Sequence, residues 1–240
     1  MAEDGLVTSF QTKPNFDGEL DMGVIGSMGI YIFNKDDLLE QLIKDSHNID
    51  SSHDFTREII PEMVKTHGVY CYSFLDKQTG ELSYWRDVGT LDSYWKANMD
   101  LLKHPEQLQL ADDDWLIHSE PTRGAPTQVR SSAAHDIARI SNSILTNGCI
   151  ISSSYIEDTI ISSNVSVSHS CKIIGSVIHP NVSISQNCDI TKAVIGNGCF
   201  LPDGIVIGKN TNDDRKKFRV SEGGVVLVTS EMLGQKPITT

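Results

Sequence analysis

The stretch "ILTNGCIISSSYIEDTIISSNVSVSHSCKIIGSVIHPNVSISQNCDITKAVIGNGCFLPDGIVI", residues 144–207, decides the fold because aliphatic residues recur in it at fixed intervals. The step is six residues within a set of three and five between sets, so each position returns after 17 residues. Three positions per turn predict a β-helix of hexapeptides, with each aliphatic side chain stacked in the bore on its counterpart one coil away. Four coils follow from the recurring residues, which are Ile144, Ile150, Ile156, Ile161, Val167, Ile173, Ile178, Ile184, Ile190, Ile195, Leu201 and Ile207.

Small or apolar residues four positions after these anchors also fit the bore. They include Cys171 and Cys188 on one side of the coil and Val165, Val182 and Cys199 on another. We therefore interpret the cysteines of this region as packing residues rather than redox groups.

The segment that follows the repeat carries a Gly-Gly turn and the β-branched run from Val225 to Val228. The end of a β-helix leaves backbone groups unpaired, so such a run could close the last coil or pair with another subunit. The sequence therefore predicts either a closing strand or an oligomer contact here.

Residues 5–102 have a different pattern, in which extended and helical stretches alternate. Segments 24–33, 69–75 and 81–85 have the composition of strands. Residues 34–45 predict a helix capped by Asn34, and residues 53–68 predict a second helix that Pro61 must kink or restart. This order is typical of an α/β fold.

Asp87 lies between the third strand-like segment and a helix predicted to begin after Thr90. Ligands of open α/β sheets bind at the carboxyl ends of strands. A carboxylate there could hold a divalent cation against phosphate oxygens. The alternative is a local ion pair between Arg86 and Asp87 that orients the turn.

Composition limits the function classes. The chain has 240 residues, a formal net charge of -12 and 39% hydrophobic residues, which argue against a general binder of nucleic acids or anionic membranes. Its five cysteines form no CxxC pair, so neither a disulfide framework nor a zinc site is indicated. We expect a cytoplasmic protein without a leader peptide or a membrane span.

Five motifs together carry a resemblance to a known family. The chain resembles the carboxyl-terminal portion of bacterial ADP-glucose pyrophosphorylase, also called glucose-1-phosphate adenylyltransferase. Members form ADP-glucose and diphosphate from ATP and glucose 1-phosphate with Mg²⁺, in glycogen biosynthesis, and assemble as tetramers. The motifs are "SMGIYIF" (27–33), "SSHDF" (51–55), "YWRDVGTLDSYWKANMDLL" (84–102), "LPDGIVIG" (201–208) and "EGGVVLVTSEML" (222–233).

The resemblance implies a fold of two parts. Residues 1–103 would be the carboxyl-terminal part of a Rossmann-like α/β nucleotidyltransferase domain. Residues 104–139 would be a linker, and residues 140–240 a left-handed parallel β-helix with its closing segment. The fold class expected is thus an incomplete nucleotidyltransferase α/β segment followed by a left-handed β-helix.

The resemblance also assigns residues to the site. Asp87 matches the carboxylate at the magnesium and sugar-phosphate centre, and Lys13 matches the lysine that binds the phosphate of glucose 1-phosphate. Ser27 matches the serine that contacts the glucose. Thr12 stands where the family has a glutamate, which removes an acceptor for sugar hydroxyls.

The family's Gly-rich, Arg-containing loop for the ATP phosphates has no counterpart in residues 1–79, nor has its second metal-binding aspartate. Nucleotidyl transfer depends on holding both substrates and the metal in place. We therefore expect the isolated chain to be inactive, and to assemble with itself or with a full-length homologue.

Two alternatives remain open from the sequence. A hexapeptide acyltransferase would share the coil and could use His169 or His179 as a base at a subunit interface. A non-catalytic β-helix subunit could instead assemble with a full-length pyrophosphorylase and alter its regulation.

Overall fold

The computed structural model describes residues 5–12, 25–76, 79–105, 124–131 and 137–236. It divides into two compact units, Met1–Trp85 and Arg86–Thr240, and each is described by itself. Across these described ranges, no helix combines the length and apolarity needed to cross a membrane.

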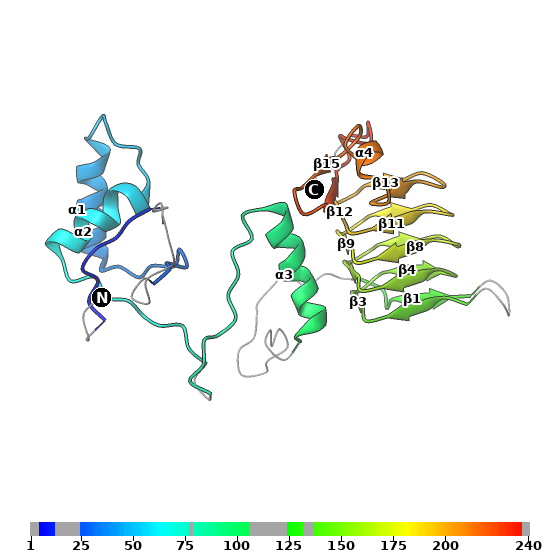
Figure 1. Ribbon diagram of the computed structural model, residues 1–240, viewed down its shortest axis with the longest axis horizontal. Helices are drawn as coiled ribbons and strands as arrows, with labels where there is room; N and C mark the ends of the chain where they lie inside the picture. Colours follow the sequence, from blue (N-terminus) through cyan, green and yellow to red (C-terminus); the bar gives the residue numbers. More distant parts are fainter. Residues whose placement is uncertain (1–4, 13–24, 77–78, 106–123, 132–136, 237–240) are drawn as a thin grey trace. The chain divides into compact units, whose positions relative to one another are not determined.

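The second unit contains the β-helix predicted from the repeat, built from three sheets whose strands, apart from one antiparallel edge strand, are parallel and stack in sequence order (Figure 1). This architecture agrees with the left-handed β-helix expected from the resemblance. One sheet consists of β1 (Gln128–Arg130), β4 (Ile150–Ser152), β7 (Ser166–Val167), β10 (Ser183–Ile184) and β13 (Phe200–Leu201). The next consists of β2 (Arg139–Ser141), β5 (Tyr155–Glu157), β8 (Lys172–Ile174), β11 (Asp189–Thr191) and β14 (Val206–Ile207). The third consists of β3 (Ile144–Leu145), β6 (Ile160–Ile161), β9 (Val177–Ile178), β12 (Ala193–Ile195), β16 (Val226–Val228) and, antiparallel at its edge, β15 (Arg219–Val220).

The predicted aliphatic positions from Ile156 onward fill the bore, and each is at most 1% exposed. The predictions for Ile144 and Ile150 are wrong, because these side chains are 36% and 38% exposed. Their neighbours take the bore positions instead, since Leu145 pairs with Ile161 and Ile151 pairs with Val167. The first coil is one residue shorter than the later ones, and a shift of one residue turns a strand's side chains to the opposite face.

The cysteines predicted to pack in the coil do so. Cys171, Cys188 and Cys199 are at most 2% exposed and belong to the same core cluster as the aliphatic residues. Cys149 is also fully buried there, and all five cysteines of the chain are free thiols. Burial raises the pKa of Cys188 and of Cys199 to about 11, which keeps both as neutral thiols at physiological pH.

The corners of the coil explain the residues between the strands. Each corner places one residue per coil at positive φ, a conformation that glycine and asparagine adopt most readily. Along one corner Asn164 donates to Asn181 at 3.3 Å, and Asn181 donates to Asn197 at 3.2 Å. The three columns are Gly148, Asn164, Asn181 and Gly198; Ser153, Ser170, Asn187 and Gly204; and Asn142, Asp158, Gly175, Lys192 and Gly208.

The carboxyl-terminal segment closes the last coil, as one of the two alternatives predicted. Strand β16 pairs in parallel with β12, and β15 turns back along β16. The short helix α4 (Thr211–Asp214) precedes β15, and Phe218 between them is 8% exposed against the core. This segment satisfies backbone groups that the last strand of the third sheet would otherwise leave unpaired.

Helix α3 (Leu91–Lys103) packs on the third sheet of the coil. Met99 is 4% exposed and lies among Val177, Val194 and Val225. The helix begins at the predicted place, where the side chains of Thr90 and Ser93 form a capping box. A helix inside the "YWRDVGTLDSYWKANMDLL" motif thus belongs to the same compact unit as the β-helix.

The first unit is built around helices. Helix α1 (Lys35–Ser46) begins as predicted at Asn34, whose side chain accepts a hydrogen bond from the Asp36 N–H. The second predicted helix forms as a π-helical turn η1 (Phe55–Ile59) followed by α2 (Ile60–Thr66). Pro61 lies in the first turn of α2, so it restarts the helix, as the sequence allowed.

The strands predicted at 24–33, 69–75 and 81–85 are not formed in the described residues of the first unit. Among the described residues, the second and third segments take part in isolated bridges only, Tyr70 with Leu6 and Leu75 with Leu82. A strand exists only where a neighbour pairs along its length, and these segments have too little pairing between them. Their apolar side chains remain accessible, and Ile32 is 99% exposed.

Candidate functional site

Asp87 lies three residues before the cap of α3, and its side chain is exposed. Its Oδ1 accepts a hydrogen bond from the Gly89 N–H at 3.0 Å. Both carboxylate oxygens lie close to Gly89, since a Cβ added there would be 3.3 Å from each. The carboxylate therefore folds over the backbone of the turn and keeps one oxygen without a hydrogen bond in the described structure.

Arg86 forms its ion pair with Asp100 rather than with Asp87. Its Nη2 lies 2.7 Å from Asp100 Oδ2, and the Asp100 side chain is only 17% exposed. The alternative of an Arg86–Asp87 pair is therefore wrong, because α3 presents a better shielded carboxylate to the guanidinium. Asp87 is left available for another cation.

Thr12 is the described neighbour of the predicted phosphate-binding lysine. Its Oγ1 donates to the main-chain oxygen of Thr56 at 2.7 Å, which ties this segment to the π-helical turn η1. The hydroxyl thus has a structural partner. Lys13 lies outside the described residues.

Ser27 is exposed at the start of the "SMGIYIF" motif. Its Oγ accepts from the Gly29 N–H at 3.1 Å and lies 2.7 Å from the Tyr31 hydroxyl. Gly29 has a φ of +73°, so the motif turns back on the serine. This turn presents the Ser27 hydroxyl to solvent.

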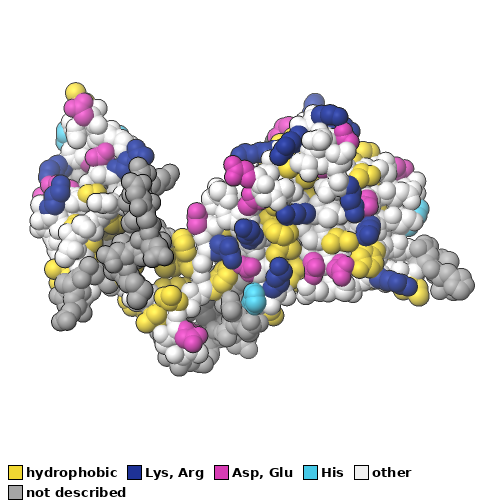
Figure 2. Space-filling view, viewed as in Figure 1, with side chains coloured by type: hydrophobic (Ala, Val, Ile, Leu, Met, Phe, Trp, Pro, Cys, Tyr) yellow, Lys and Arg dark blue, Asp and Glu magenta, His cyan; other side chains and the backbone are white. Residues whose placement is uncertain are grey.

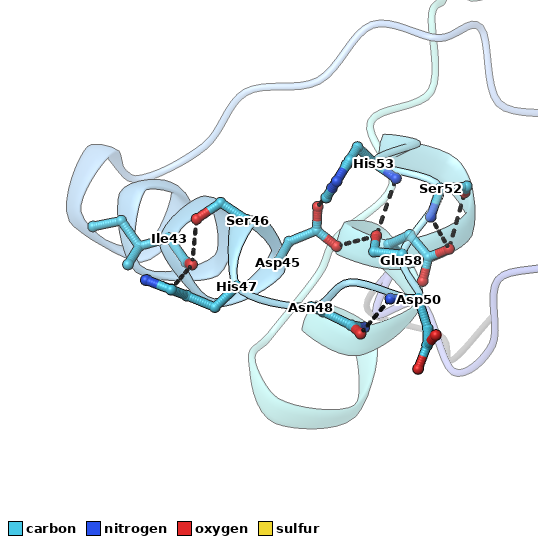
Figure 3. A network of polar contacts seen from close by, with 10 residues as sticks. Ile43, Asp45, Ser46, His47, Asn48, Asp50, Ser52, His53 and Glu58 are labelled. Carbon is cyan, nitrogen blue, oxygen red and sulfur yellow. Dashed lines mark hydrogen bonds and ion pairs between the residues drawn. The ribbon is translucent and has the colours of Figure 1, made fainter.

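A polar network organises the "SSHDF" motif, and sequence reasoning gave it no role (Figure 3). His53 Nδ1 lies 2.7 Å from one oxygen of Asp45, and Ser51 donates to the other at 2.5 Å. These bonds lower the pKa of Asp45, the hydrogen bond from Ser51 contributing most. They hold His53 at a φ of +54°, a conformation that costs a non-glycine residue energy.

The network has a structural purpose that the motif itself signals. Ser52 donates to Glu58 through both its hydroxyl and its N–H, and the Asp54 side chain caps η1. The loop between α1 and η1 is thereby fixed, and with it the turn to which Thr12 is bonded.

The predicted site residues fall in different units. Thr12 and Ser27 lie in the unit Met1–Trp85, and Asp87 lies in the unit Arg86–Thr240. The described residues contain no cluster of three or more His, Cys, Asp or Glu side chains suited to a metal ion. Asp87 could therefore contribute one ligand to a cation, but the described part of the chain forms no metal site by itself.

Of the two histidines that an acyltransferase could use, His169 is exposed on the coil, whereas His179 already has a partner within the unit. His179 Nε2 lies 3.0 Å from the Tyr94 hydroxyl of α3, and the ring is half-buried beneath that helix. Burial lowers the pKa of His179. Its role in the structure is to join α3 to the coil.

Charged side chains of both signs are interspersed over the visible face of the β-helix unit (Figure 2). Within the described residues of this unit, Lys216 pairs with Asp213 at 2.7 Å and Lys209 with Asp189 at 3.3 Å. The mixture of signs on this face differs from the basic face that a nucleic-acid binder uses.

Two family models match the chain, one for each part of the fold. Residues 1–104 match a model described as "Nucleotidyl transferase", and residues 125–228 match one described as "GlmU-like, C-terminal hexapeptide". The matches agree with the order of segments predicted from the sequence.

Curated relatives named "Glucose-1-phosphate adenylyltransferase" align along almost the entire chain. The protein of Nitrosococcus oceani is 41% identical over 239 residues, which cover 98% of this chain and 56% of the relative. That of Methylococcus capsulatus is 43% identical over 210 residues, covering 88% and 50%. That of Saccharophagus degradans is 42% identical over 242 residues, covering 99% and 57%.

The chain thus spans about half the length of the curated relatives it matches. Identity of about 40% over some 240 residues is far above what unrelated chains share, and it extends through both parts of the fold. The chain is therefore homologous to the glucose-1-phosphate adenylyltransferases along nearly all of its own length, joining a nucleotidyl transferase segment to a GlmU-like hexapeptide segment.

Proposed function

We propose that this chain provides the glucose 1-phosphate-binding part of a glucose-1-phosphate adenylyltransferase. In that reaction a phosphate oxygen of glucose 1-phosphate attacks the α-phosphorus of ATP, and diphosphate leaves as ADP-glucose forms. The observation that carries the proposal is the alignment of 98% of the chain with enzymes of this name, which includes the exposed carboxylate at Asp87.

The proposed roles follow the chemistry of each side chain. Lys13 binds the phosphate of glucose 1-phosphate as a point charge, and Ser27 offers its exposed hydroxyl to the glucose. Thr12 replaces a carboxylate and already donates to Thr56, so we expect weaker binding of sugar hydroxyls than a glutamate would give. Asp87 carries the negative charge that a bridging cation requires.

A magnesium ion would neutralise charge on the phosphates during this reaction. The described residues suit it only in part, because Asp87 is a single carboxylate and Mg²⁺ prefers six oxygen ligands. We propose that Asp87 supplies one ligand and that nucleotide phosphates and water supply others.

Turnover needs a nucleotide-binding part that these 240 residues do not carry, because no Gly-rich phosphate loop occurs in residues 1–79. We propose that a full-length homologue supplies such a part, and that the chain assembles with that homologue or with itself; a homo-oligomer of this chain alone would still lack the part. Free thiols at all five cysteines support a reducing compartment, and we propose the cytoplasm.

The test measures binding and turnover separately. Glucose 1-phosphate with Mg²⁺ is titrated calorimetrically into the purified 240-residue chain, and diphosphate release is followed after ATP is added. We expect binding that Asp87→Asn and Lys13→Ala weaken, without diphosphate release. Asp203→Asn, which changes an exposed carboxylate at a coil corner, serves as the control and should bind normally.

Turnover that Asp87→Asn abolishes would show that the chain holds a complete site and would contradict the need for a partner. Absence of glucose 1-phosphate binding by a folded chain would overturn the proposal. It would favour a non-catalytic role in assembly with a longer homologue.

A further inference from the structure

The first turn of α3 is bonded to the segment that closes the β-helix, more than 120 residues further along the chain. Ser221 Oγ donates to Asp92 Oδ1 at 2.7 Å, and the Gly223 N–H donates to Asp92 Oδ2 at 3.1 Å. Both oxygens of one carboxylate are thus used to join the helix to the coil. We call Asp92, Ser221 and Gly223 the Asp92 clasp.

The closing segment is shaped around this carboxylate. Ser221 Oγ also accepts from the Val225 N–H at 2.9 Å, and Lys192 Nζ donates to the Gly223 main-chain oxygen at 2.5 Å. A Cβ at residue 223 would lie 2.4 Å from Asp92 Oδ1, closer than any side chain allows. Gly223 is not among the glycines with positive φ. The close approach of Asp92, not the backbone conformation, is what requires glycine here.

Further contacts along α3 hold it to the same sheet. Trp95 Nε1 donates to the Gly175 main-chain oxygen at 2.7 Å, and the Tyr94 hydroxyl meets His179 at 3.0 Å. Lys192 Nζ lies 5.4 Å from the centre of the Trp95 ring. With the clasp at its start and Met99 buried near its end, the helix is fixed to the coil along its length.

Asp87 lies in the short segment that leads directly into this helix. Only Val88 and Gly89 separate it from the Thr90 cap, and its carboxylate is itself bonded to the Gly89 N–H. Arg86, on the other side, is paired with Asp100 of α3 at 2.7 Å. Segment 86–90 is therefore anchored to α3 at both ends.

We propose that the Asp92 clasp is a positioning device, through which the closing segment of the β-helix sets the place of the Asp87 carboxylate. Asp92, Ser221 and Gly223 act through α3 and do not touch the substrate. The consequence for glucose 1-phosphate rests on the proposed function. The β-helix then helps to position Asp87, in addition to any role in assembly.

The test uses hydrogen exchange read by mass spectrometry on the 240-residue chain. Asp92→Asn leaves one acceptor oxygen where the carboxylate offered two, and it removes the negative charge that strengthens both bonds of the clasp. We expect exchange at residues 86–92 and 219–224 to rise about tenfold, with strands β7 to β11 unchanged. Asp203→Asn removes a carboxylate that accepts from Gln186 elsewhere on the coil, and should leave both segments unchanged.

Two further variants keep the test decisive. Ser221→Ala removes only one bond to Asp92, so it should show a smaller rise in the same segments even where Asp92→Asn does not fold. Asp92→Glu, which restores the acceptors, should recover part of the protection. Unchanged exchange at residues 86–90 in a folded Asp92 or Ser221 variant would overturn the proposal, and so would a uniform rise throughout the coil.

Binding provides a second readout that a purely structural role would not change. Where the parent chain binds glucose 1-phosphate with Mg²⁺, Asp92→Asn should weaken that binding about tenfold while the thermal midpoint of the coil stays the same. Unweakened binding would contradict the positioning role. If the parent chain binds no sugar phosphate, the proposed function fails, but the exchange at residues 86–90 still decides whether the clasp holds Asp87.

Discussion

The β-helix and the first 85 residues use similar apolar residues and reach different degrees of order. Ile190 in the coil is fully buried, whereas Ile32 in the first unit is 99% exposed. Each coil strand finds its neighbour about 17 residues away, as Ile190 does with Ile173. In the described part of the first unit, the strand-like segments take part in only two isolated bridges. A repeat supplies its own pairing partners, whereas a non-repetitive sheet depends on all of its strands being present together.

Removing a bore side chain should have the largest effect. Ile190→Ala leaves a cavity between Ile173 and Ile207, with no nearby surface that could collapse to fill it. We expect a loss of about 2–5 kcal/mol in the free energy of unfolding of the coil. The free energy of unfolding can be measured by titrating with urea and using the hydrogen-exchange protection of the coil strands as the signal. Unfolding of the first unit does not contribute to that signal.

The matched control is Ile32→Ala, which removes the same atoms from an exposed position and should change stability by less than about 0.5 kcal/mol. A large effect at Ile32 would mean that the first unit buries this side chain in solution. The contrast between the two units would then disappear.

The cysteine of the first unit, Cys71, should be alkylated about a hundredfold faster, or more, than the cysteines of the coil. A pKa of about 11 leaves roughly one molecule in a thousand of Cys188 and Cys199 as thiolate at pH 8, and both sulfurs are buried. Cys71 is partly accessible in the first unit. Alkylation followed by peptide mass spectrometry should label Cys71 first, with the coil cysteines modified only after denaturation. Labelling of Cys188 at a similar rate would show that the coil opens readily.

The coil was the most predictable part because its signal is repeated and local. Each strand position occurs several times in the sequence, so the bore from Ile156 to Ile207 could be assigned directly. The error at Ile144 and Ile150 arose where the repeat shortens by one residue, a change that no neighbouring coil signals. The closing strand β16 was recognised by its β-branched run, although the sequence allowed a subunit contact equally well.

The candidate site was less predictable because its geometry depends on distant residues. Spacing identified Asp87 and the cap at Thr90, yet it could not show that Arg86 turns to Asp100 or that Asp92 reaches Ser221. Such pairs are separated by up to 131 positions and leave no periodic trace. The predicted Gly-Gly turn is present, but no feature of the sequence indicated that Gly223 also makes room for the Asp92 carboxylate.

Substitutions at Trp95 and Trp85 test how firmly α3 belongs to the coil. Trp95→Phe removes the hydrogen bond to Gly175 and weakens the contact with Lys192, and should cost about 1–2 kcal/mol in local stability. Exchange at residues 91–103 measures the loss. Trp85→Phe changes a tryptophan that is 46% exposed and should leave that exchange unaltered. Equal effects of both variants would mean that the contacts of Trp95 with the coil are not what protects α3 from exchange.

The smallest effect expected is a pH dependence of the contact between α3 and the coil. Burial lowers the pKa of His179 below its ordinary 6.5, so the folded chain favours the neutral ring. The stabilisation is complete above pH 6.5 and is lost as the pH falls from there toward the folded-state pKa, because the unfolded chain takes up the proton first. Exchange of α3, corrected for its intrinsic pH dependence, should therefore be faster at pH 5.5 than at pH 7.5. His179→Gln should abolish this difference, whereas His169→Gln, at an exposed position on the coil, should retain it. A difference that persists in His179→Gln would assign the titration to another group.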